Sequence, residues 1–308
     1  MKKLLVIPYE MEQVGQGIGP HTFRSVHTEK LKAAGGDAVE VMVALPENAL
    51  PLLSEAEMIA AFPSTMPDSS ATPHVKWMHS FSAGVDRVLT PTVAASDILV
   101  SNSSGVHATP IAEHIIGFML MFTRRFHVSL QNQKEYLWHK DQSLDELSGK
   151  VVLIVGLGEI GREAARLAAA FHARVWAVSR SGKNKPEYVE RLGVREELDD
   201  LLTQADFVVI TLPHTDETHH LFDEKKFTRM KRGARIINIG RGGIIHETDL
   251  IKALASGQVG GAGLDVTEIE PLPKSSPLWN MENVLITPHH SGLSQRYMAR
   301  AVDLLCKN

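Results

Sequence analysis

One glycine-rich segment constrains the fold of this 308-residue chain more than any other feature. The uninterrupted apolar run Val151–Val155 is typical of a central strand in a parallel sheet, where helices cover both faces. It leads directly into Gly156-Leu157-Gly158-Glu159-Ile160-Gly161, which a helical pattern follows at 162–171. A strand, a G-x-G-x-x-G turn and a helix in this order predict a βαβ unit that binds a dinucleotide.

The glycines of this turn have separate physical roles. Gly156 permits the tight turn, Gly158 lets a pyrophosphate approach the backbone, and Gly161 lets the helix pack against the strand. Free N–H groups at the start of the helix, around Glu159 and Ile160, then hold the phosphates together with the helix dipole. Glycine-rich turns are common, so the flanking strand and helix make this signal strong.

Length and composition fit two globular domains, because a domain takes roughly 150 residues. Hydrophobic residues make up 44% of the chain and charged residues 22%. With 32 basic and 36 acidic residues, the formal net charge is −4. The chain lacks the excess of basic residues that would favour nucleic-acid binding. Its apolar stretches are too short for a membrane helix or a signal peptide. Cys306 is the single cysteine, which excludes an intrachain disulfide. We therefore expect a cytoplasmic protein that binds neither nucleic acid nor membranes.

Two series of strands and helices alternate along the chain. The first series has predicted strands at 3–8, 38–45, 58–62 and 75–79 and a helix at 22–34. The second has predicted strands at 150–155, 173–179, 207–212, 234–239, 261–266 and 284–287. Between them, a helical pattern at 109–138 starts at Thr109-Pro110, which suit the N-cap and the first helical position. The alternation predicts two α/β domains with parallel sheets.

Six segments resemble the D-isomer-specific 2-hydroxyacid dehydrogenase family, in the family's order and over nearly the whole sequence. They are Ser82-Ala83-Gly84-Val85-Asp86, the glycine turn, Leu212-Pro213 with Thr218, Asn238-Ile239-Gly240-Arg241-Gly242, Leu264-Asp265-Val266 with Glu270-Pro271-Leu272, and Thr287-Pro288-His289. Each segment alone is modest evidence, but the six together are highly specific.

The resemblance implies two doubly wound parallel-sheet domains: a Rossmann cofactor domain inserted into a flavodoxin-like substrate domain. On this chain the substrate-binding domain would take residues 1–101 and 288–308, and the dinucleotide-binding domain 102–287, with the active site in the cleft between them. Family members generally dimerise through the cofactor domain, using the segment around 109–138. Apolar residues around much of that helix favour a homodimer here: Ile111, Ile115, Phe118, Met119 and Phe122.

Reduction of a 2-keto acid needs a hydride donor, a proton donor and an anchor for the carboxylate. Arg241 suits the anchor, because a guanidinium binds a carboxylate through two charge-assisted hydrogen bonds and can polarise the ketone oxygen. His289 suits the proton donor, because histidine titrates near neutrality, and the family pattern favours it over the adjacent His290. We therefore expect Arg241 and His289 to contact the substrate.

Glu270 completes the predicted catalytic triad. Its carboxylate would hydrogen-bond His289, favour the imidazolium and fix the orientation of the ring, with Glu268 and Glu247 as nearby alternatives. The related formate dehydrogenases carry glutamine at this position, so a glutamate favours hydroxyacid chemistry.

The resemblance implies further binding residues. Ser82, Ala83 and Gly84 follow a strand end and would present backbone N–H groups to the substrate carboxylate. Asp265 resembles the family aspartate that bonds the nicotinamide carboxamide. The complete set of expected cofactor-binding residues is Thr109, Gly156, Gly158, Glu159, Ile160, Gly161, Ser179, Arg180, Ser181, Lys183, Leu212, Pro213, Thr218, Ile239, Gly240, Asp265, Ser291 and Gly292. Trp279 and Phe81 are candidates for shaping the pocket, although buried aromatic residues more often belong to the core.

The end of the strand at 173–179 predicts which cofactor binds. An NAD enzyme of this fold usually carries an acid there that hydrogen-bonds both ribose hydroxyls. Here Ser179-Arg180-Ser181 occupy that place, with Lys183 close behind. The missing acid and the added cations predict a preference for NADP(H) over NAD(H). The alternative is that Arg180 only stacks on the adenine and both cofactors are used.

The leading hypothesis is NAD(P)H-dependent reduction of a small 2-keto acid, such as glyoxylate or hydroxypyruvate, to the D-2-hydroxy acid, and the reverse reaction. The alternative is a dinucleotide-sensing regulatory protein, because certain transcriptional corepressors share this fold and the triad. No metal is expected, since the pairs His219-His220 and His289-His290 are adjacent in sequence and their side chains should diverge.

Overall fold

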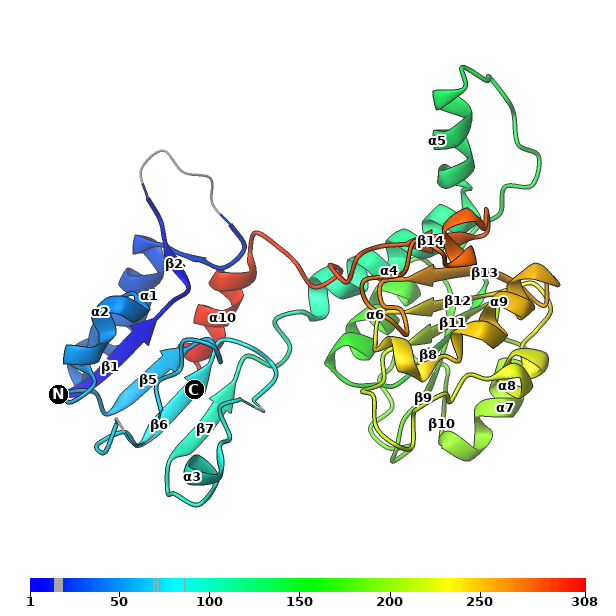
Figure 1. Cartoon of the computed structure of the whole chain (residues 1–308). Coiled ribbons are helices and arrows are strands. Elements are labelled where there is room, and N and C mark those ends of the chain that lie inside the picture. Colours follow the sequence, from blue (N-terminus) through cyan, green and yellow to red (C-terminus); the bar gives the residue numbers. More distant parts are fainter. Residues whose placement is uncertain (14–18, 69, 71, 86) are drawn as a thin grey trace. The chain divides into compact units, whose positions relative to one another are not determined.

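The structure, a computed structural model, describes residues 1–13, 19–68, 70, 72–85 and 87–308. It divides into two compact units, with residues 1–107 and 293–308 in unit 1 and residues 108–292 in unit 2 (Figure 1). Asp86, which belongs to one of the six family-like segments, lies outside the described residues. Throughout the described ranges, every helix is too short or too polar to cross a membrane.

Unit 1 is built on a five-stranded parallel sheet with the order β4-β1-β5-β6-β7. Its strands are β1 (Lys2–Ile7), β4 (Val39–Val43), β5 (Met58–Ala61), β6 (Trp77–Ser80) and β7 (Leu99–Asn102). Its helices are α1 (Ser25–Gly35), α2 (Pro46–Ala49), α3 (Pro91–Ala94) and α10 (Tyr297–Leu305). Counted along the chain, the strand order is 2-1-3-4-5, that of flavodoxin-like folds, and it reverses between β1 and β5. The expected flavodoxin-like fold is therefore confirmed.

Unit 2 is built on a seven-stranded parallel sheet with the order β10-β9-β8-β11-β12-β13-β14. Its strands are β8 (Val151–Val155), β9 (Arg174–Val178), β10 (Arg191–Gly193), β11 (Phe207–Ile210), β12 (Ala234–Asn238), β13 (Val259–Leu264) and β14 (Val284–Ile286). Counted along the chain, this is the order 3-2-1-4-5-6 of the Rossmann fold with one more strand at the edge. The predicted Rossmann domain is confirmed.

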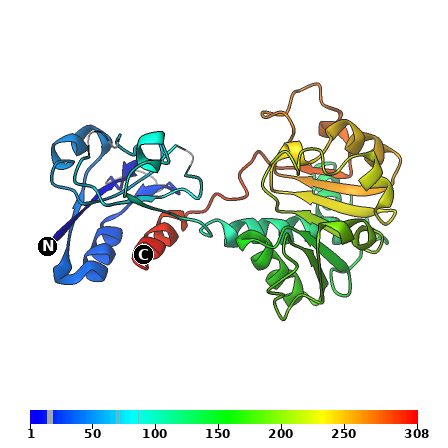
Figure 2. The ribbon, with the colours of Figure 1, turned by 90° about the horizontal axis from the view of Figure 1, so that it is seen from below.

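Helices cover both faces of the unit 2 sheet (Figure 2). They are α4 (Ala108–Thr123), α6 (Glu159–Ala170), α7 (Leu198–Leu202), α8 (Glu224–Arg229) and α9 (Glu247–Ala255), whereas α5 (Phe126–Lys134) has no buried residue. Successive side chains of β8 point to opposite faces, so Leu153 packs into the core under α7, α8 and α9, whereas Ile154 packs into the core under α4 and α6. All five residues of β8 are buried, which explains its uninterrupted apolar sequence.

Several boundaries differ from the sequence prediction. The pattern at 109–138 forms two helices, because Arg125 adopts a left-handed backbone conformation (φ 49°) between α4 and α5. Thr109 lies in the first turn of α4, which begins at Ala108, and does not cap it. The helix predicted from residue 22 begins at Ser25, since Thr22–Phe23 form the short strand β3 paired with β2 (Glu10–Met11). The edge strands β7 and β10 were not predicted, and β7 extends unit 1 beyond the expected boundary at residue 101.

The apolar side chains of α4 do not form a surplus surface, so they do not support the homodimer that was expected from them. Ile111, Ile115, Phe118, Met119 and Phe122 are all buried inside unit 2. Phe118 and Phe122 lie so close to the sheet that Cβ atoms on its glycines at 263 and 261 would stand 2.8 and 2.9 Å from their rings. Large exposed apolar side chains occur further along, in α5 and the segment after it: Phe126, Leu130, Tyr136, Leu137 and Trp138.

Unit 1 contains a fully buried histidine on β6, the strand next to the edge strand β7. His79 on β6 hydrogen-bonds the Oγ atoms of Ser101 (Nδ1, 2.8 Å) and Ser103 (Nε2, 3.1 Å). Burial lowers the pKa of His79 from 6.5 to about 4, because the charged ring would lose its hydration. The folded protein therefore keeps this ring neutral at a pH where the unfolded chain is already protonated.

We expect His79 to make unit 1 sensitive to acid. Between about pH 6.5 and about pH 4 the unfolded chain binds a proton at this ring and the folded chain does not, so the free energy of unfolding falls by about 3 kcal/mol as the pH drops. His79→Gln should be less stable at neutral pH but should lose about 2 kcal/mol less on acidification. Urea unfolding at several pH values measures this, and an unchanged slope in the variant would contradict it.

Candidate active site

The glycines in the turn between β8 and α6 have different structural roles. Gly156 has φ 108°, a conformation that favours glycine, and its N–H donates to the carbonyl of Val178 on β9. A Cβ atom at Gly161 would lie 2.0 Å from the carbonyl oxygen of Gly156, so this glycine lets α6 pack against the turn. A Cβ atom at Gly158 would meet nothing within 4 Å, so this position faces open space. The free N–H groups at the start of α6 follow directly.

Alanine at these two glycines should have opposite consequences. We expect Gly161→Ala to destabilise unit 2 by more than about 3 kcal/mol, because the methyl group overlaps the carbonyl of Gly156. Gly158→Ala should cost at most about 1 kcal/mol, the difference between a glycine and an alanine N-cap. It should nevertheless weaken dinucleotide binding about tenfold or more, since the methyl group stands where the pyrophosphate approaches.

Thermal unfolding without cofactor and calorimetric titration with NADP⁺ measure the two effects separately. Equal loss of stability in both variants, or wild-type affinity in Gly158→Ala, would contradict this division of roles.

The turn after β9 presents hydroxyl groups and cations. Ser179 Oγ accepts a hydrogen bond from the N–H of Gly182 (3.1 Å), and Ser181 Oγ accepts one from the N–H of Lys183 (3.3 Å). Arg180 and Lys183 are exposed, and neither forms an ion pair with any described residue. The four residues that are expected at the ribose of the cofactor thus lie on one turn after β9, the strand beside β8, and none of them is an acid.

The loops after β11 and β12 lie against each other. Thr218 Oγ1 donates to the carbonyl of Pro213 (2.8 Å) and closes the first loop. A Cβ atom at Gly240 would lie 2.6 Å from the carbonyl oxygen of Leu212, which shows how closely the second loop approaches it. Leu212, Pro213, Thr218, Ile239 and Gly240 are therefore brought together at the carboxyl end of the sheet.

Asn238 holds the loop that carries Arg241. Its side chain is buried at the end of β12, where Oδ1 accepts from the N–H of Gly240 (3.0 Å) and Nδ2 donates to the carbonyl of Arg241 (3.0 Å). The guanidinium of Arg241 is exposed, and Nη1 donates to the carbonyl of Gly240 (2.7 Å). Asn238 is not among the site residues expected from the sequence, although a polar residue at the end of an apolar strand is a usable signal.

Glu270 and His289 form a hydrogen-bonded pair. Glu270 Oε2 lies 2.8 Å from His289 Nδ1, and Oε1 accepts from the N–H of Thr267 (3.2 Å). The contact at Nδ1 leaves Nε2 of His289 without a partner among the described residues. His289 has φ 51°, a strained conformation for a non-glycine residue, held by donation from its N–H to the carbonyl of Asp265 (2.8 Å).

The other two acids considered for this role have different partners. Glu268 pairs with His220 at 2.7 Å, and Glu247 accepts a hydrogen bond from the N–H of Glu268 (3.3 Å). Arg241, Glu270 and His289 follow β12, β13 and β14, which are neighbours in the parallel sheet. All three residues therefore lie at the carboxyl ends of the strands of the unit 2 sheet.

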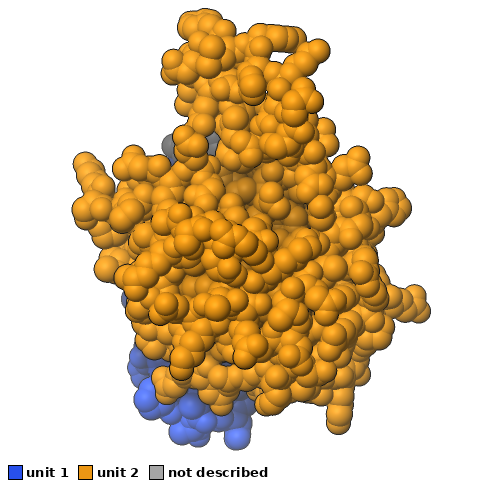
Figure 3. Space-filling model, turned by 90° about the vertical axis from the view of Figure 1, so that its right-hand side faces the viewer, with its two compact units in different colours: residues 1–107, 293–308 blue, residues 108–292 orange. Residues whose placement is uncertain are grey.

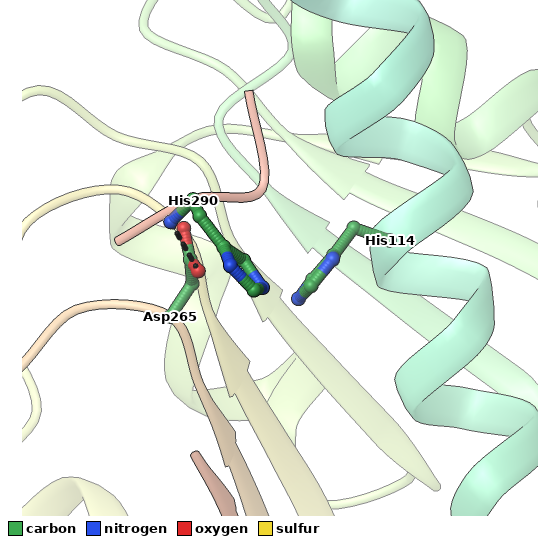
Figure 4. Close-up of side chains that lie close together, drawn as sticks. All are labelled: His114, Asp265 and His290. Atoms are coloured by element: carbon green, nitrogen blue, oxygen red, sulfur yellow. Dashed lines mark hydrogen bonds between the residues drawn. The ribbon is translucent and has the colours of Figure 1, made fainter. Parts of the chain in front are cut away.

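Asp265 anchors a polar cluster that includes His290, and Figure 4 shows these two residues together with His114. Its buried carboxylate accepts hydrogen bonds from Thr287 Oγ1 (2.6 Å) and from the N–H groups of His290 (3.0 Å) and Ser291 (3.1 and 3.2 Å). Burial alone would raise the pKa of Asp265, but the hydrogen bonds outweigh it and hold that pKa below its ordinary value.

His114 of α4 joins this cluster, although nothing in the sequence pointed to it. Its Nε2 atom lies 3.0 Å from Thr287 Oγ1, and ligand atoms of His114, Asp265 and His290 all lie within 4.8 Å of one another (Figure 4). A metal ion could use such a spacing, but the Asp265 carboxylate is already engaged by three residues. The ring of His290 lies near His114, 5.6 Å between centroids, whereas that of its neighbour His289 lies at Glu270.

Unit 1 holds the remaining expected site residues in a pocket of about 390 Å³. Ser82 and Gly84 line this pocket together with Tyr9, Phe62, Ser64 and Arg87. No described residue accepts a hydrogen bond from the backbone N–H of Ala83 or Gly84, so both donors are available to an anion. Phe81 is fully buried in the core of unit 1 and does not line the pocket, while Trp279 in unit 2 is half-exposed and donates to the carbonyl of Pro273.

Comparison with known proteins gives a consistent result. A sequence model described as "D-isomer specific 2-hydroxyacid dehydrogenase, NAD binding domain" matches residues 116–291. The glyoxylate reductase of Thermofilum pendens is 32% identical over 77% of this chain and 72% of that protein. A solved structure of a D-isomer specific 2-hydroxyacid dehydrogenase family protein from Aeromonas salmonicida has a TM-score of 0.79 and 32% identity, covering 100% of this chain and 94% of that chain.

A second solved structure is the NADPH-dependent glyoxylate/hydroxypyruvate reductase of Sinorhizobium meliloti in complex with NADP and sulfate. Its TM-score is 0.71 with 30% identity, covering 99% of this chain and 93% of that chain.

Proposed function

This chain belongs to the D-isomer-specific 2-hydroxyacid dehydrogenase family, and on that premise we propose that it reduces a small 2-keto acid to the D-2-hydroxy acid and catalyses the reverse reaction. As a member of this family it is an oxidoreductase that uses a nicotinamide cofactor. The observation that carries the proposal is the Glu270–His289 pair, which stands at the same sheet edge as Arg241. A dinucleotide-sensing regulator, the alternative raised by the sequence, is not favoured by the relatives.

The three polar residues divide the work of the reduction. Arg241 binds the carboxylate of the substrate and polarises the ketone oxygen, where negative charge develops. The nicotinamide, when bound, supplies the hydride that the carbonyl carbon accepts. Nε2 of His289 then gives a proton to the ketone oxygen, and Glu270 on Nδ1 orients the ring and stabilises its protonated form. In the oxidation direction His289 takes the proton back.

The chain's own residues fit a dinucleotide. Open space over Gly158 and free N–H groups at the start of α6 suit a pyrophosphate, and the ionised Asp265 suits a carboxamide N–H donor. We propose that unit 2 binds the cofactor through the eighteen residues expected from the sequence, and that unit 1 binds the substrate through Ser82, Ala83 and Gly84. The turn at Ser179–Lys183 favours NADP(H), with NAD(H) as the weaker cofactor.

A panel of 2-keto acids tests the proposal directly. Glyoxylate, hydroxypyruvate and pyruvate are supplied with NADPH or NADH, and cofactor oxidation and product configuration are measured. We expect at least one acid to be reduced to the D-2-hydroxy acid, with NADPH preferred. No oxidation of either cofactor by any acid would refute the proposed function.

We also propose a homodimer whose interface is formed by residues after α4 rather than by the apolar side chains of α4. In Figures 1 and 3, α5 and the segment after it project from the rest of unit 2, and Tyr136 and Trp138 are 96% and 95% exposed. A second copy that covers this apolar arm would remove it from water.

Sedimentation should therefore show a dimer at micromolar concentration. Phe126→Glu with Leu130→Glu should give monomers, because charges on both exposed positions oppose burial of the arm. Leu50→Glu, at a more exposed apolar site in unit 1, should remain dimeric. A monomeric wild-type protein would contradict the proposal.

A further inference from the structure

The pocket in unit 1 lies at the topological switch point of its sheet. Tyr9 follows β1, Phe62 and Ser64 follow β5, and the strand order reverses between these two strands. Ligands of open α/β sheets bind at the carboxyl ends of the strands at such a point. The volume, about 390 Å³, is within the range of small-molecule sites. The pocket therefore lies where a small-molecule site is expected in this fold, and Ser82 and Gly84 are among its lining residues.

The polar groups of this pocket suit an anion. Arg87 is the one charged side chain among its lining residues, and none of them is an acid. Ser64 Oγ donates to the hydroxyl of Tyr9 (2.8 Å), and among the described residues nothing accepts from Tyr9 in turn, so its O–H can donate to a ligand. The ring of Tyr9 packs on Phe62, 5.0 Å between centroids, which holds the hydroxyl in place.

Arg87 has no counter-charge within the described part of unit 1. Arg24 in the same unit pairs with Glu12 at 3.4 Å, whereas no described carboxylate pairs with Arg87. A guanidinium offers a planar fork of donors that matches a carboxylate or a phosphate. The same loop also carries the free N–H groups of Ala83 and Gly84, which form a separate position for an anion.

We propose that Arg87 and the hydroxyl of Tyr9 form a second anion subsite, so that the preferred substrate is a 2-keto acid with a carboxylate or phosphate at its far end. This inference rests on the proposed function, in which the backbone N–H groups of Ala83 and Gly84 bind the carboxylate next to the ketone. Arg87 is then the specificity-determining residue for the remainder of the substrate, and it takes no part in the proton or hydride transfer.

Matched pairs of acids test the subsite. For a carboxylate the pair is 2-oxoglutarate and 2-oxopentanoate, and for a phosphate it is 3-phosphohydroxypyruvate and hydroxypyruvate. We expect the wild-type enzyme to prefer the anionic member of at least one pair about tenfold or more in kcat/KM, the effect of one charged hydrogen bond. The pair that shows the preference identifies the anion.

Variants then assign the preference to Arg87. Arg87→Gln should abolish it and leave kcat/KM for the neutral acid within about twofold, and Arg87→Lys should keep part of it because the charge remains. Lys32→Gln is the charge-matched control. Lys32 lies in the last turn of α1, where Gly35 contacts Val39 at the start of β4, and thus at the opposite end of the strands from the pocket.

Two results would overturn the subsite while the proposed function stands. One is a wild-type enzyme that uses the neutral acid of each pair as well as its anionic partner. The other is an equal loss of both acids in Arg87→Gln, which would mean that Arg87 binds the carboxylate that all substrates share. Failure of the wild type to reduce any 2-keto acid would overturn both proposals.

Discussion

In the His289→Ala enzyme, kcat for 2-keto acid reduction is expected to fall by roughly 10²- to 10⁴-fold, the contribution of a positioned general acid. The dissociation constant of the dinucleotide should change by less than about twofold, because three strands of the sheet separate β14, which precedes His289, from β8, which precedes the phosphate-binding turn. The cause is specific to Nε2, which is the nitrogen left free when Glu270 occupies Nδ1. The adjacent His290 cannot take over, because its ring lies beside His114.

Two glutamine substitutions test Glu270, the partner of His289, against a matched control. Glu270→Gln removes the charge that orients and stabilises the imidazolium, so kcat should fall by about tenfold or more. Glu268→Gln removes the same charge two residues away, where the carboxylate pairs with His220, and kcat should stay within about twofold of wild type. Near-normal kcat in His289→Ala, or equal effects of the two glutamine substitutions, would place the proton donor elsewhere.

The parts of this site that could be predicted are those governed by local chemistry. The conformation of the glycine turn depends on residues that are close together in sequence. Gly156 adopts φ 108°, and Gly161 approaches the carbonyl of Gly156. Parallel strands place their carboxyl ends on one edge, so the residues after β12, β13 and β14 were expected together once the strands were recognised.

The parts that could not be predicted depend on distant partners. The break between α4 and α5 is at Arg125, a residue type that rarely adopts a left-handed conformation, so the sequence carried no signal for it. The burial of Phe118 and Phe122 depends on Gly261 and Gly263, which let the helix approach β13 and which follow it by well over a hundred residues. His114 meets Asp265 for the same reason, since α4 crosses the sheet beside β13 and β14.

The choice between NADPH and NADH should depend on the turn after β9. Ser179 stands where an acid would repel a 2′-phosphate, and the exposed Arg180 and Lys183 have no carboxylate partner among the described residues. One charged hydrogen bond is worth about 1.5–3 kcal/mol, which corresponds to a preference for NADPH of roughly 10- to 150-fold in kcat/KM. If Arg180 only stacks on adenine, the two cofactors should be used about equally.

A double variant at this turn should reverse the preference. Ser179→Asp with Arg180→Ala introduces the acid that bonds both ribose hydroxyls and removes the cation, so NADH should become the better cofactor in kcat/KM and NAD⁺ the tighter ligand by calorimetry. Arg174→Ala is the control, because it removes a cation that pairs with Glu190 at the opposite end of β9, and it should leave the ratio unchanged. A wild-type enzyme that uses NADH as well as NADPH would mean that the turn has been interpreted wrongly, and that its serines and cations make no contact with the 2′-phosphate.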